Sequence, residues 1–232
     1  MEHYFALPPL VDDIYLEKAS QFGSANLCDG MKGLGIPNDG CMEASMLPVD
    51  ENLSMVGTAC TVETQDGDNF PIHVAIYQGK PGYVLVVDGK GYMGKAYMGD
   101  LMGGAAKAIG FEGVVVDGCV RDRLGLKAMQ LPVFSKGIMP RGPGKTGPGK
   151  INTTIMCAGI TVHPGDLVVG DCDGVAVVPR DRIEEVLQAT QKKVSYEIDR
   201  RIAISKYEEC RKNHTELPNL APSWVTEMLS KQ

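Results

Sequence analysis

Short apolar segments alternate with helical patterns through the middle of the chain. The runs YVLVVDG at 83–89, GVVVDG at 113–118 and LPVFSKG at 131–137 end in turn residues, while 100–110 and 121–130 have helical compositions. Apolar strands that alternate with helices are typical of βαβ units, in which a parallel sheet is covered on both faces. The pattern predicts an α/β fold whose ligand site lies beyond the carboxyl ends of the strands.

The N-terminal third predicts mainly helices. We expect helices over 8–22, 24–35 and 70–78 and a strand over 55–64. Either residue of the Asp68-Asn69 pair can cap the helix that begins at Phe70, because both side chains carry an acceptor oxygen.

The C-terminal part predicts strands followed by a charged helix. Turns of the Pro-Gly-Asp and Asp-x-Asp-Gly types separate strands within 160–179, and a helix capped by Asp181 is expected to end near Lys212. A terminal helix with this many charges rarely packs fully on its own domain, so we expect it to reach a neighbouring subunit. The predicted organisation is a domain of residues 1–180 and a C-terminal helical extension of residues 181–232.

Composition narrows the class of protein. The chain has 232 residues, 44% hydrophobic and 22% charged, which is enough for a core without disulfides or metals. A net charge of −6 argues against a general nucleic-acid-binding role. No apolar run reaches the roughly 18 residues of a membrane span. Residues 1–13 lack the pattern of a secretory signal, so a cytoplasmic location is expected.

Cysteines and histidines offer no evident metal motif. The seven cysteines contain no C-x-x-C pair, and the four histidines contain no H-x-x-x-H pair. Cys60, Cys119 and Cys157 lie in apolar surroundings and are expected to be small buried side chains. We therefore select no histidine as catalytic.

Two glycine-rich segments resemble nucleotide-binding loops. The G-x-G-x-x-G motif at 89–94 follows a strand, but five residues separate it from the helix cap expected at Asp100, so we interpret it as a surface loop. The segment 144–151 places Ile151 where a phosphate-binding loop needs Ser or Thr. We interpret 140–150 as a mobile loop over a site. Dinucleotide binding remains a weaker alternative.

Asp100, Arg121 and Asp122 form the strongest candidate site. Twenty residues, 101–120, separate the first from the second. Since neighbouring parallel strands lie about 4.8 Å apart, the segments after them should bring these side chains to one crevice. Two carboxylates can hold a hard divalent cation, an arginine can bind an oxyanion, and a helix N-terminus can bind a carboxylate. The alternative is a surface ion pair at a turn.

The motifs around this site resemble those of a known superfamily. The segment DLMGGAAKAIGFEGVVVDGCVRD, the later PVFSKG, and G-x-x-V-x-PGD-x-x-x-x-D-x-DGVAVVP are similar to the RraA-like superfamily. More narrowly they resemble its 4-hydroxy-4-methyl-2-oxoglutarate/4-carboxy-4-hydroxy-2-oxoadipate aldolases, which are class II pyruvate aldolases. The resemblance covers about 29–182 and implies a swivelling β/β/α fold. It also implies homotrimers or homohexamers with sites at subunit interfaces, and Mg²⁺ or Mn²⁺ as cofactor.

The resemblance also implies residue roles. Asp122 matches the direct metal ligand, and Asp100 matches the carboxylate that holds a metal-bound water. Arg121 matches the residue that contacts the keto oxygen of pyruvate. The amides of Leu101 and Met102 match the donors to the pyruvate carboxylate.

Two further assignments follow from the same resemblance. Gly99 belongs to the expected substrate-binding segment. An acidic residue from the C-terminal helix of a neighbouring subunit completes the site in these aldolases, and here Glu197 or Asp199 could serve, although the surrounding sequence departs from the family's pattern.

The expected function is metal-dependent cleavage of a 4-hydroxy-2-oxo-dicarboxylate to pyruvate and a second keto acid. Decarboxylation of oxaloacetate is an expected side activity, because both reactions pass through the pyruvate enolate. The main alternative is a non-catalytic RraA-type regulator that binds a ribonuclease. For the aldolase function, the expected partner is a small 2-keto acid substrate, and binding to nucleic acid or to a membrane is not expected.

Overall fold

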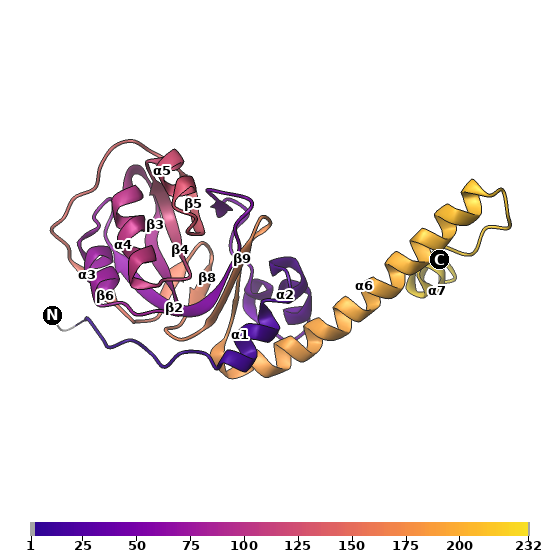
Figure 1. The fold of residues 1–232 in the computed structure, drawn as a ribbon. Coiled ribbons are helices and arrows are strands. Elements are labelled where there is room, and N and C mark those ends of the chain that lie inside the picture. The colour runs from indigo at the N-terminus through magenta and orange to yellow at the C-terminus, as the bar shows by residue number, and fades with distance from the viewer. Residues whose placement is uncertain (1–2, 232) are drawn as a thin grey trace. The chain divides into compact units, whose positions relative to one another are not determined.

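The computed structural model describes residues 3–231 (Figure 1). Contacts within the chain divide it into two units, residues 1–190 and residues 191–232. The first unit contains the central sheet, and the second continues a long helix and ends in a short one. Each unit is described by itself below.

The first unit is built on a mixed sheet in the order β1-β5-β4-β3-β2-β9-β10, with β6 also paired to β2. The pairs β2–β3, β3–β4 and β4–β5 are parallel, and the others are antiparallel. The expected α/β class is therefore confirmed. The strands are β1 Leu47–Pro48, β2 Met55–Thr64, β3 Tyr83–Met98, β4 Gly113–Val120, β5 Val133–Ile138, β6 Gly149–Ile151, β9 Leu167–Asp171 and β10 Gly174–Val178.

Helices precede, connect and follow these strands, and a separate hairpin lies outside the sheet. The helices are α1 Asp13–Ala19, α2 Ser24–Met31, α3 Phe70–Tyr77, α4 Asp100–Ile109, α5 Arg123–Ala128, α6 Ile183–Lys212 and α7 Ser223–Leu229. Short 3-10 turns cover Pro37–Gly40 and Arg180–Arg182. The hairpin consists of β7 Ile155–Cys157 and β8 Ile160–Val162.

Alternate residues of the apolar strands enter two different cores. Leu85 and Val87 pack in the core that includes α3, α4 and α5, whereas Val84 and Val86 pack with residues of the β7–β8 hairpin. Successive side chains of a strand point to opposite faces, so a strand covered on both sides needs an uninterrupted apolar run. One face is thus covered by helices (Figure 1) and the other by a β hairpin, which gives the layers of the β/β/α arrangement.

The glycine-rich segment 89–94 is not a surface loop, and that expectation is wrong. β3 continues through it to Met98, with register shifts against β4 and positive φ at Lys90 and Gly91. The buried Tyr97 stabilises this irregular strand: its hydroxyl donates to the Gly89 carbonyl at 2.7 Å and accepts from the Gly67 amide at 3.1 Å. This side-chain contact is long-range, so the local motif did not predict it.

Several element ends differ from the predictions. The first two helices are shorter than expected, and the helical turn expected over 121–130 begins only at Arg123. Asn69 is the N-cap residue of α3, but its side chain makes no cap hydrogen bond; the Phe70 amide instead donates to Oδ1 of Asp68 at 2.9 Å. Asp181 lies in the 3-10 turn before α6. The three cysteines expected to be buried are buried.

α6 belongs to both units, because the contacts divide the chain at 190/191. The domain division expected at 180/181 stays a prediction. In its first two turns Ile183, Val186, Leu187 and Thr190 are buried. In the second unit Arg200 donates to the Leu220 carbonyl at 2.7 Å. No helix within residues 3–231 is long and apolar enough to cross a membrane.

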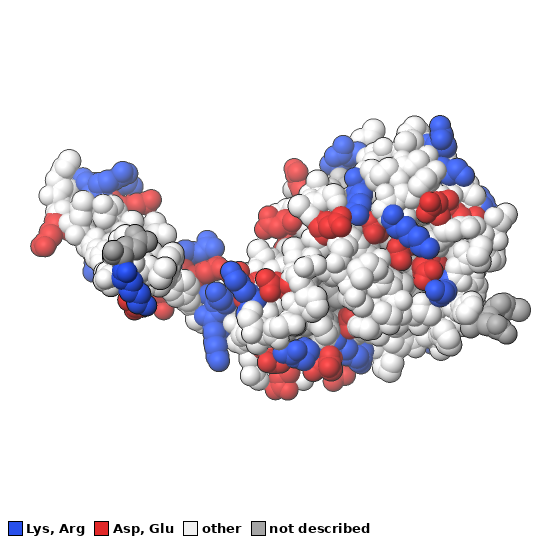
Figure 2. All heavy atoms as spheres, turned by 180° about the vertical axis from the view of Figure 1, so that it is seen from behind, with Lys and Arg blue, Asp and Glu red and all other residues white. Residues whose placement is uncertain are grey.

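The second unit leaves large apolar side chains exposed within the single chain. They include Tyr196, Ile198, Ile202, Ile204 and Trp224. On the face drawn in Figure 2, acidic and basic side chains are interspersed over both parts of the chain.

The two halves of α6 should differ in their contribution to stability. Leu187 is 1% exposed, so Leu187→Ala should lower the free energy of unfolding by about 2–5 kcal/mol, the usual range for a buried leucine. Ile202→Ala, the control on the same helix, should change it by less than about 0.5 kcal/mol when measured on the dissociated chain, because Ile202 is exposed there. Urea denaturation measures both. Equal losses would show that Ile202 is buried in solution.

Candidate active site

The three residues selected from the sequence meet where β3 and β4 end. Met98 pairs with Val120 at the last register position, and the Arg121 amide donates to the Met98 carbonyl at 2.9 Å. Asp100 therefore begins α4 beside the turn that holds Arg121 and Asp122. The adjacency arises because β3 extends to this edge of the sheet, and not through a long loop.

Two glycines allow the carboxylates to approach the backbone. A Cβ atom on Gly99 would overlap Oδ2 of Asp122, and one on Gly125 would lie 2.7 Å from Oδ2 of Asp100. Any larger residue at either position would have to displace a carboxylate. The placement of both acidic groups thus depends on a small residue on the opposite segment.

Arg121 and Asp122 form an ion pair at the mouth of the site. Arg121 Nε lies 3.3 Å from Asp122 Oδ2, and both side chains are partly exposed. Asp122 has φ +57°, an uncommon conformation for a residue other than glycine, and stands at the N-cap of α5. Such conformations concentrate at functional sites when the surrounding structure holds them in place.

A small pocket of about 120 Å³ contains all the predicted positions of the first unit. It is lined by Asn69, His73, Met98, Gly99, Asp100, Leu101, Met102, Arg121, Asp122, Pro143 and Lys145. The N-cap of α4 is Gly99, which has no side chain to satisfy the first amides of the helix. These amides are available to an anion in the pocket, where the helix dipole favours negative charge.

Five lining residues, Asn69, His73, Met98, Pro143 and Lys145, were not identified from the sequence. The spacing of Asn69 and His73 places them one turn apart at the start of α3, and that spacing was the available signal. Asn69 donates to the Tyr97 carbonyl at 2.9 Å and lies 3.1 Å from Met102 Sδ. Among the described side chains its buried Oδ1 has no hydrogen-bond partner, so Asn69 retains an acceptor for a ligand.

Burial and the charge of Lys145 both lower the pKa of His73, with burial the larger cause. The imidazole is therefore neutral near pH 7 and can donate one hydrogen bond and accept another. Sequence reasoning set the histidines aside because they lie far apart along the chain, whereas the fold brings His73 to the pocket.

Glu197 and Asp199 lie on α6 in the second unit. Glu197 forms an ion pair with Arg201 at 3.7 Å. Their assignment to a neighbouring site stays a prediction.

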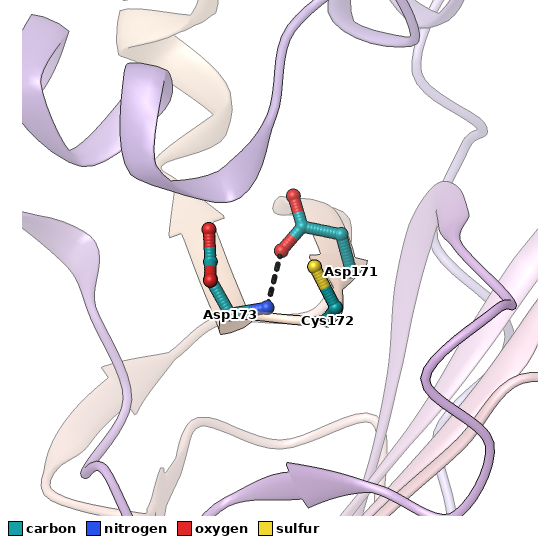
Figure 3. A group of neighbouring side chains, drawn as sticks. All are labelled: Asp171, Cys172 and Asp173. Atoms are coloured by element: carbon teal, nitrogen blue, oxygen red, sulfur yellow. Dashed lines mark hydrogen bonds between the residues drawn. The ribbon is translucent and has the colours of Figure 1, made fainter.

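A second group of potential metal-binding side chains lies close together elsewhere in the first unit. Across residues 3–231, Asp171, Cys172 and Asp173 are the three metal-binding side chains whose ligand atoms lie within 4.8 Å of one another (Figure 3). The Asp171 carboxylate already accepts from the Ser24 amide, the Ser24 hydroxyl and the Asp173 amide at 2.6, 2.7 and 3.0 Å. Through these hydrogen bonds Asp171 holds the start of α2 in place, which is a sufficient structural role for its carboxylate.

The donor set at the Asp100–Asp122 pocket fits a hard divalent cation better. Both side chains offer carboxylate oxygens, the ligands that Mg²⁺ and Mn²⁺ prefer, whereas the exposed thiol of Cys172 favours softer metals. Two carboxylates from one chain leave coordination positions for substrate and water, as is usual for Mg²⁺.

Known proteins resemble this chain over most of the first unit. The family model for RraA-like proteins, Aldolase/RraA, matches residues 24–177. A protein of Halalkalibacterium halodurans, provisionally named 4-hydroxy-4-methyl-2-oxoglutarate aldolase, is 43% identical over 164 residues, which are 71% of this chain and 78% of that protein.

Solved structures show the same fold. A crystal structure of an uncharacterised protein from Pseudomonas syringae is 28% identical with a TM-score of 0.76, and the match covers 86% of this chain and 96% of that one. The structure of Streptomyces coelicolor RraAS2, described as an unusual member of the RNase ES inhibitor RraA family, is 24% identical with a TM-score of 0.74. That match covers 82% of this chain and 98% of the other.

The electrostatic link between His73 and Lys145 can be tested without any substrate. Lys145→Gln should raise the pKa of His73, because the cation that disfavours the imidazolium is removed. The pKa should stay below its ordinary value, since burial is the larger cause. NMR titration of the His73 ring measures this, with Lys127→Gln as the control. An unchanged pKa in Lys145→Gln would place Lys145 away from the pocket.

Proposed function

Because the chain belongs to the RraA-like family, we propose that it is a divalent-metal-dependent pyruvate aldolase. Its substrate class is a 4-hydroxy-2-oxo-dicarboxylate, which it cleaves to pyruvate and a second keto acid. The observation that carries the proposal is the meeting of Asp100, Arg121 and Asp122 with the open N-terminus of α4 in one pocket. That combination matches the charges of a 2-keto acid and of the enolate formed from it.

Asp122 would hold Mg²⁺ or Mn²⁺ directly, and Asp100 would hold it through a water. The bound cation would supply Lewis-acid stabilisation of the substrate's carboxylate and keto oxygen. Asp122 suits this role because its carboxylate lies over Gly99, at the entrance to the segment that meets the substrate.

The remaining groups bind the pyruvyl end of the substrate. The amides of Leu101 and Met102 face the substrate carboxylate at the helix N-terminus. Arg121 donates to the keto oxygen, and this contact strengthens as the oxygen gains negative charge. These interactions orient C3 and stabilise the enolate.

The bond changes are the same for both expected reactions up to the enolate. In aldol cleavage the C4 hydroxyl loses its proton, the C3–C4 bond breaks, and its electron pair passes to the pyruvate enolate. Asp100 orients the water that accepts that proton and later returns one to C3. With oxaloacetate, the bond to the C4 carboxylate breaks and carbon dioxide leaves, which makes decarboxylation the expected side activity.

The pocket also favours a second carboxylate on the substrate. Lys145 supplies a cation there, and Asn69 and His73 supply polar atoms. A cationic side chain in the same pocket as the metal-binding carboxylates would distinguish dicarboxylates from simple 2-keto acids.

We further propose that the protein acts as a homotrimer or homohexamer. Leu101 and Leu124, at the starts of the two helices that frame the site, are 85% and 82% exposed in the single chain. Neighbouring apolar side chains exposed to this degree at the mouth of a polar pocket favour coverage by another subunit. Glu197 or Asp199 of such a subunit would then be the candidate for the additional acidic residue.

The alternative is a regulator of a ribonuclease, which the description of the Streptomyces coelicolor relative suggests. The two functions differ in their need for the pocket. A panel of 2-keto acids with Mg²⁺ or Mn²⁺, assayed for pyruvate with and without EDTA, separates them. EDTA-sensitive release of pyruvate supports the aldolase; no release from any panel member supports the regulator.

Asp122→Ala should abolish EDTA-sensitive turnover, because the direct ligand is lost. Asp100→Asn should retain Mn²⁺ binding, measured by electron paramagnetic resonance, but lower kcat, since it perturbs only the water. Asp173→Ala, in the other acidic cluster, should leave both unchanged. Equal loss of Mn²⁺ affinity in the Asp100 and Asp122 variants would contradict this division of roles.

Arg121→Lys keeps the positive charge but loses the planar pair of donors. The expected result is a fall in kcat of about 10²-fold or more, as for removal of one oxyanion donor. The loss should affect both aldol cleavage and oxaloacetate decarboxylation, because the enolate is common to both. Arg123→Lys is the matched control. If only aldol cleavage were impaired, Arg121 would act at the C4 end of the substrate.

A further inference from the structure

We infer that Asp68 is a positioning residue that fastens the segment 141–147 over the candidate site. This segment, called the strap below, was expected from its Pro/Gly content to be a mobile loop. The expected effect on substrate binding rests on the proposed function. The attachment of the strap by Asp68 rests only on contacts within the first unit. Asp68 itself does not line the pocket.

The Asp68 side chain is a buried acceptor for several strap donors. It is 3% exposed. Its Oδ2 accepts from the Thr146 amide at 2.8 Å and from the Thr146 hydroxyl at 3.3 Å, and its Oδ1 accepts from the Gly147 amide at 3.0 Å. The same Oδ1 accepts from the Phe70 amide at the start of α3. One carboxylate thus joins the strap to the helix that carries His73.

Three backbone hydrogen bonds attach the strap further. The Gly144 amide donates to the Gly67 carbonyl at 2.7 Å, and the Asn69 amide donates to the Gly144 carbonyl at 3.0 Å. Nearer its start, the Arg141 carbonyl accepts from the Ala96 amide in β3 at 2.8 Å. The strap is therefore held at both ends despite its irregular backbone.

The attached strap forms one wall of the pocket. Pro143 and Lys145 line the pocket beside the candidate residues. Gly142 lies against the arginine, since a Cβ atom there would be 3.1 Å from Nη1 of Arg121. The strap thus limits where the guanidinium can move and determines where the Lys145 ammonium stands.

Asp68 stays ionised in this setting. Burial acts to raise its pKa, but hydrogen bonds from Thr146, Phe70 and Gly147 outweigh burial and lower it. An ionised carboxylate can accept all four bonds, and bonds to a charged acceptor are the stronger kind. A neutral amide has one acceptor oxygen and would present an NH2 group to the remaining donors.

Asp68→Asn is the decisive variant because it retains one acceptor oxygen, which can still bind the Phe70 and Gly147 amides, while the Thr146 amide loses its acceptor. The matched control is Asp166→Asn. Asp166 is also buried and accepts two backbone amides, from His163 and Arg180, but it does not line the candidate pocket. Asp166→Asn should therefore report the cost of losing a buried carboxylate anchor without any effect on the strap.

Trypsin measures the attachment directly, since the strap contains the Arg141–Gly142 and Lys145–Thr146 bonds. In Asp68→Asn these bonds should be cleaved about tenfold faster than in the wild type, the change expected when roughly 1.4 kcal/mol of anchoring is lost. In Asp166→Asn, trypsin should cleave these bonds at the wild-type rate. Unchanged cleavage in Asp68→Asn, or equal acceleration in both variants, would overturn the inference.

Kinetics measure the consequence for the site. For the keto acid that the wild type cleaves best, Asp68→Asn should raise KM by about tenfold with a smaller effect on kcat, because Lys145 binds substrate and transition state alike. A purely structural loss of active protein would lower apparent kcat and leave KM unchanged, and that result would overturn the positioning role. If the wild type cleaves no keto acid, the proposed function fails, while proteolysis still decides whether Asp68 fastens the strap.

Discussion

The candidate site depends on the continued pairing of β3 and β4 beyond the regular part of the sheet. Their ladder survives register shifts and two residues of positive φ, and it closes with the hydrogen bond between the Arg121 amide and the Met98 carbonyl. Without that pairing, Asp100 and Asp122 would sit on independent connections. A rigid element positions functional groups more accurately than a loop does.

A buried tyrosine side chain stabilises the irregular, glycine-rich part of β3. Tyr97 is fully buried, and its hydroxyl joins the Gly89 carbonyl to the Gly67 amide. The turn that contains Gly67 leads to Asp68 and Asn69, so the same contact supports the strap anchor and a pocket residue. Burial of the phenol raises the pKa of Tyr97 to about 12, which keeps it protonated and able to donate.

The charged side chains of the proposed site lie outside the hydrophobic core. Asp100, Arg121 and Asp122 stand at element ends, where backbone groups and side chains remain open to a ligand, while the buried residues of β3 and β4 fill both cores. This separation lets related chains keep the fold and change the site. Among the relatives, one is provisionally named an aldolase and another is described as a member of an RNase inhibitor family.

The sequence by itself determined the features that depend on local pattern. Continuous apolar runs predicted a sheet covered on both faces, and the spacing of Asp100 from Arg121 predicted their meeting, because strand period and parallel pairing are regular. Only the tertiary structure decided what depends on long-range contacts. The bulged course of β3 requires Tyr97, and the strap requires Asp68 from a segment more than seventy residues earlier. His73 and Lys145 reach the pocket for the same reason: packing, and not neighbouring residues along the chain, sets their positions.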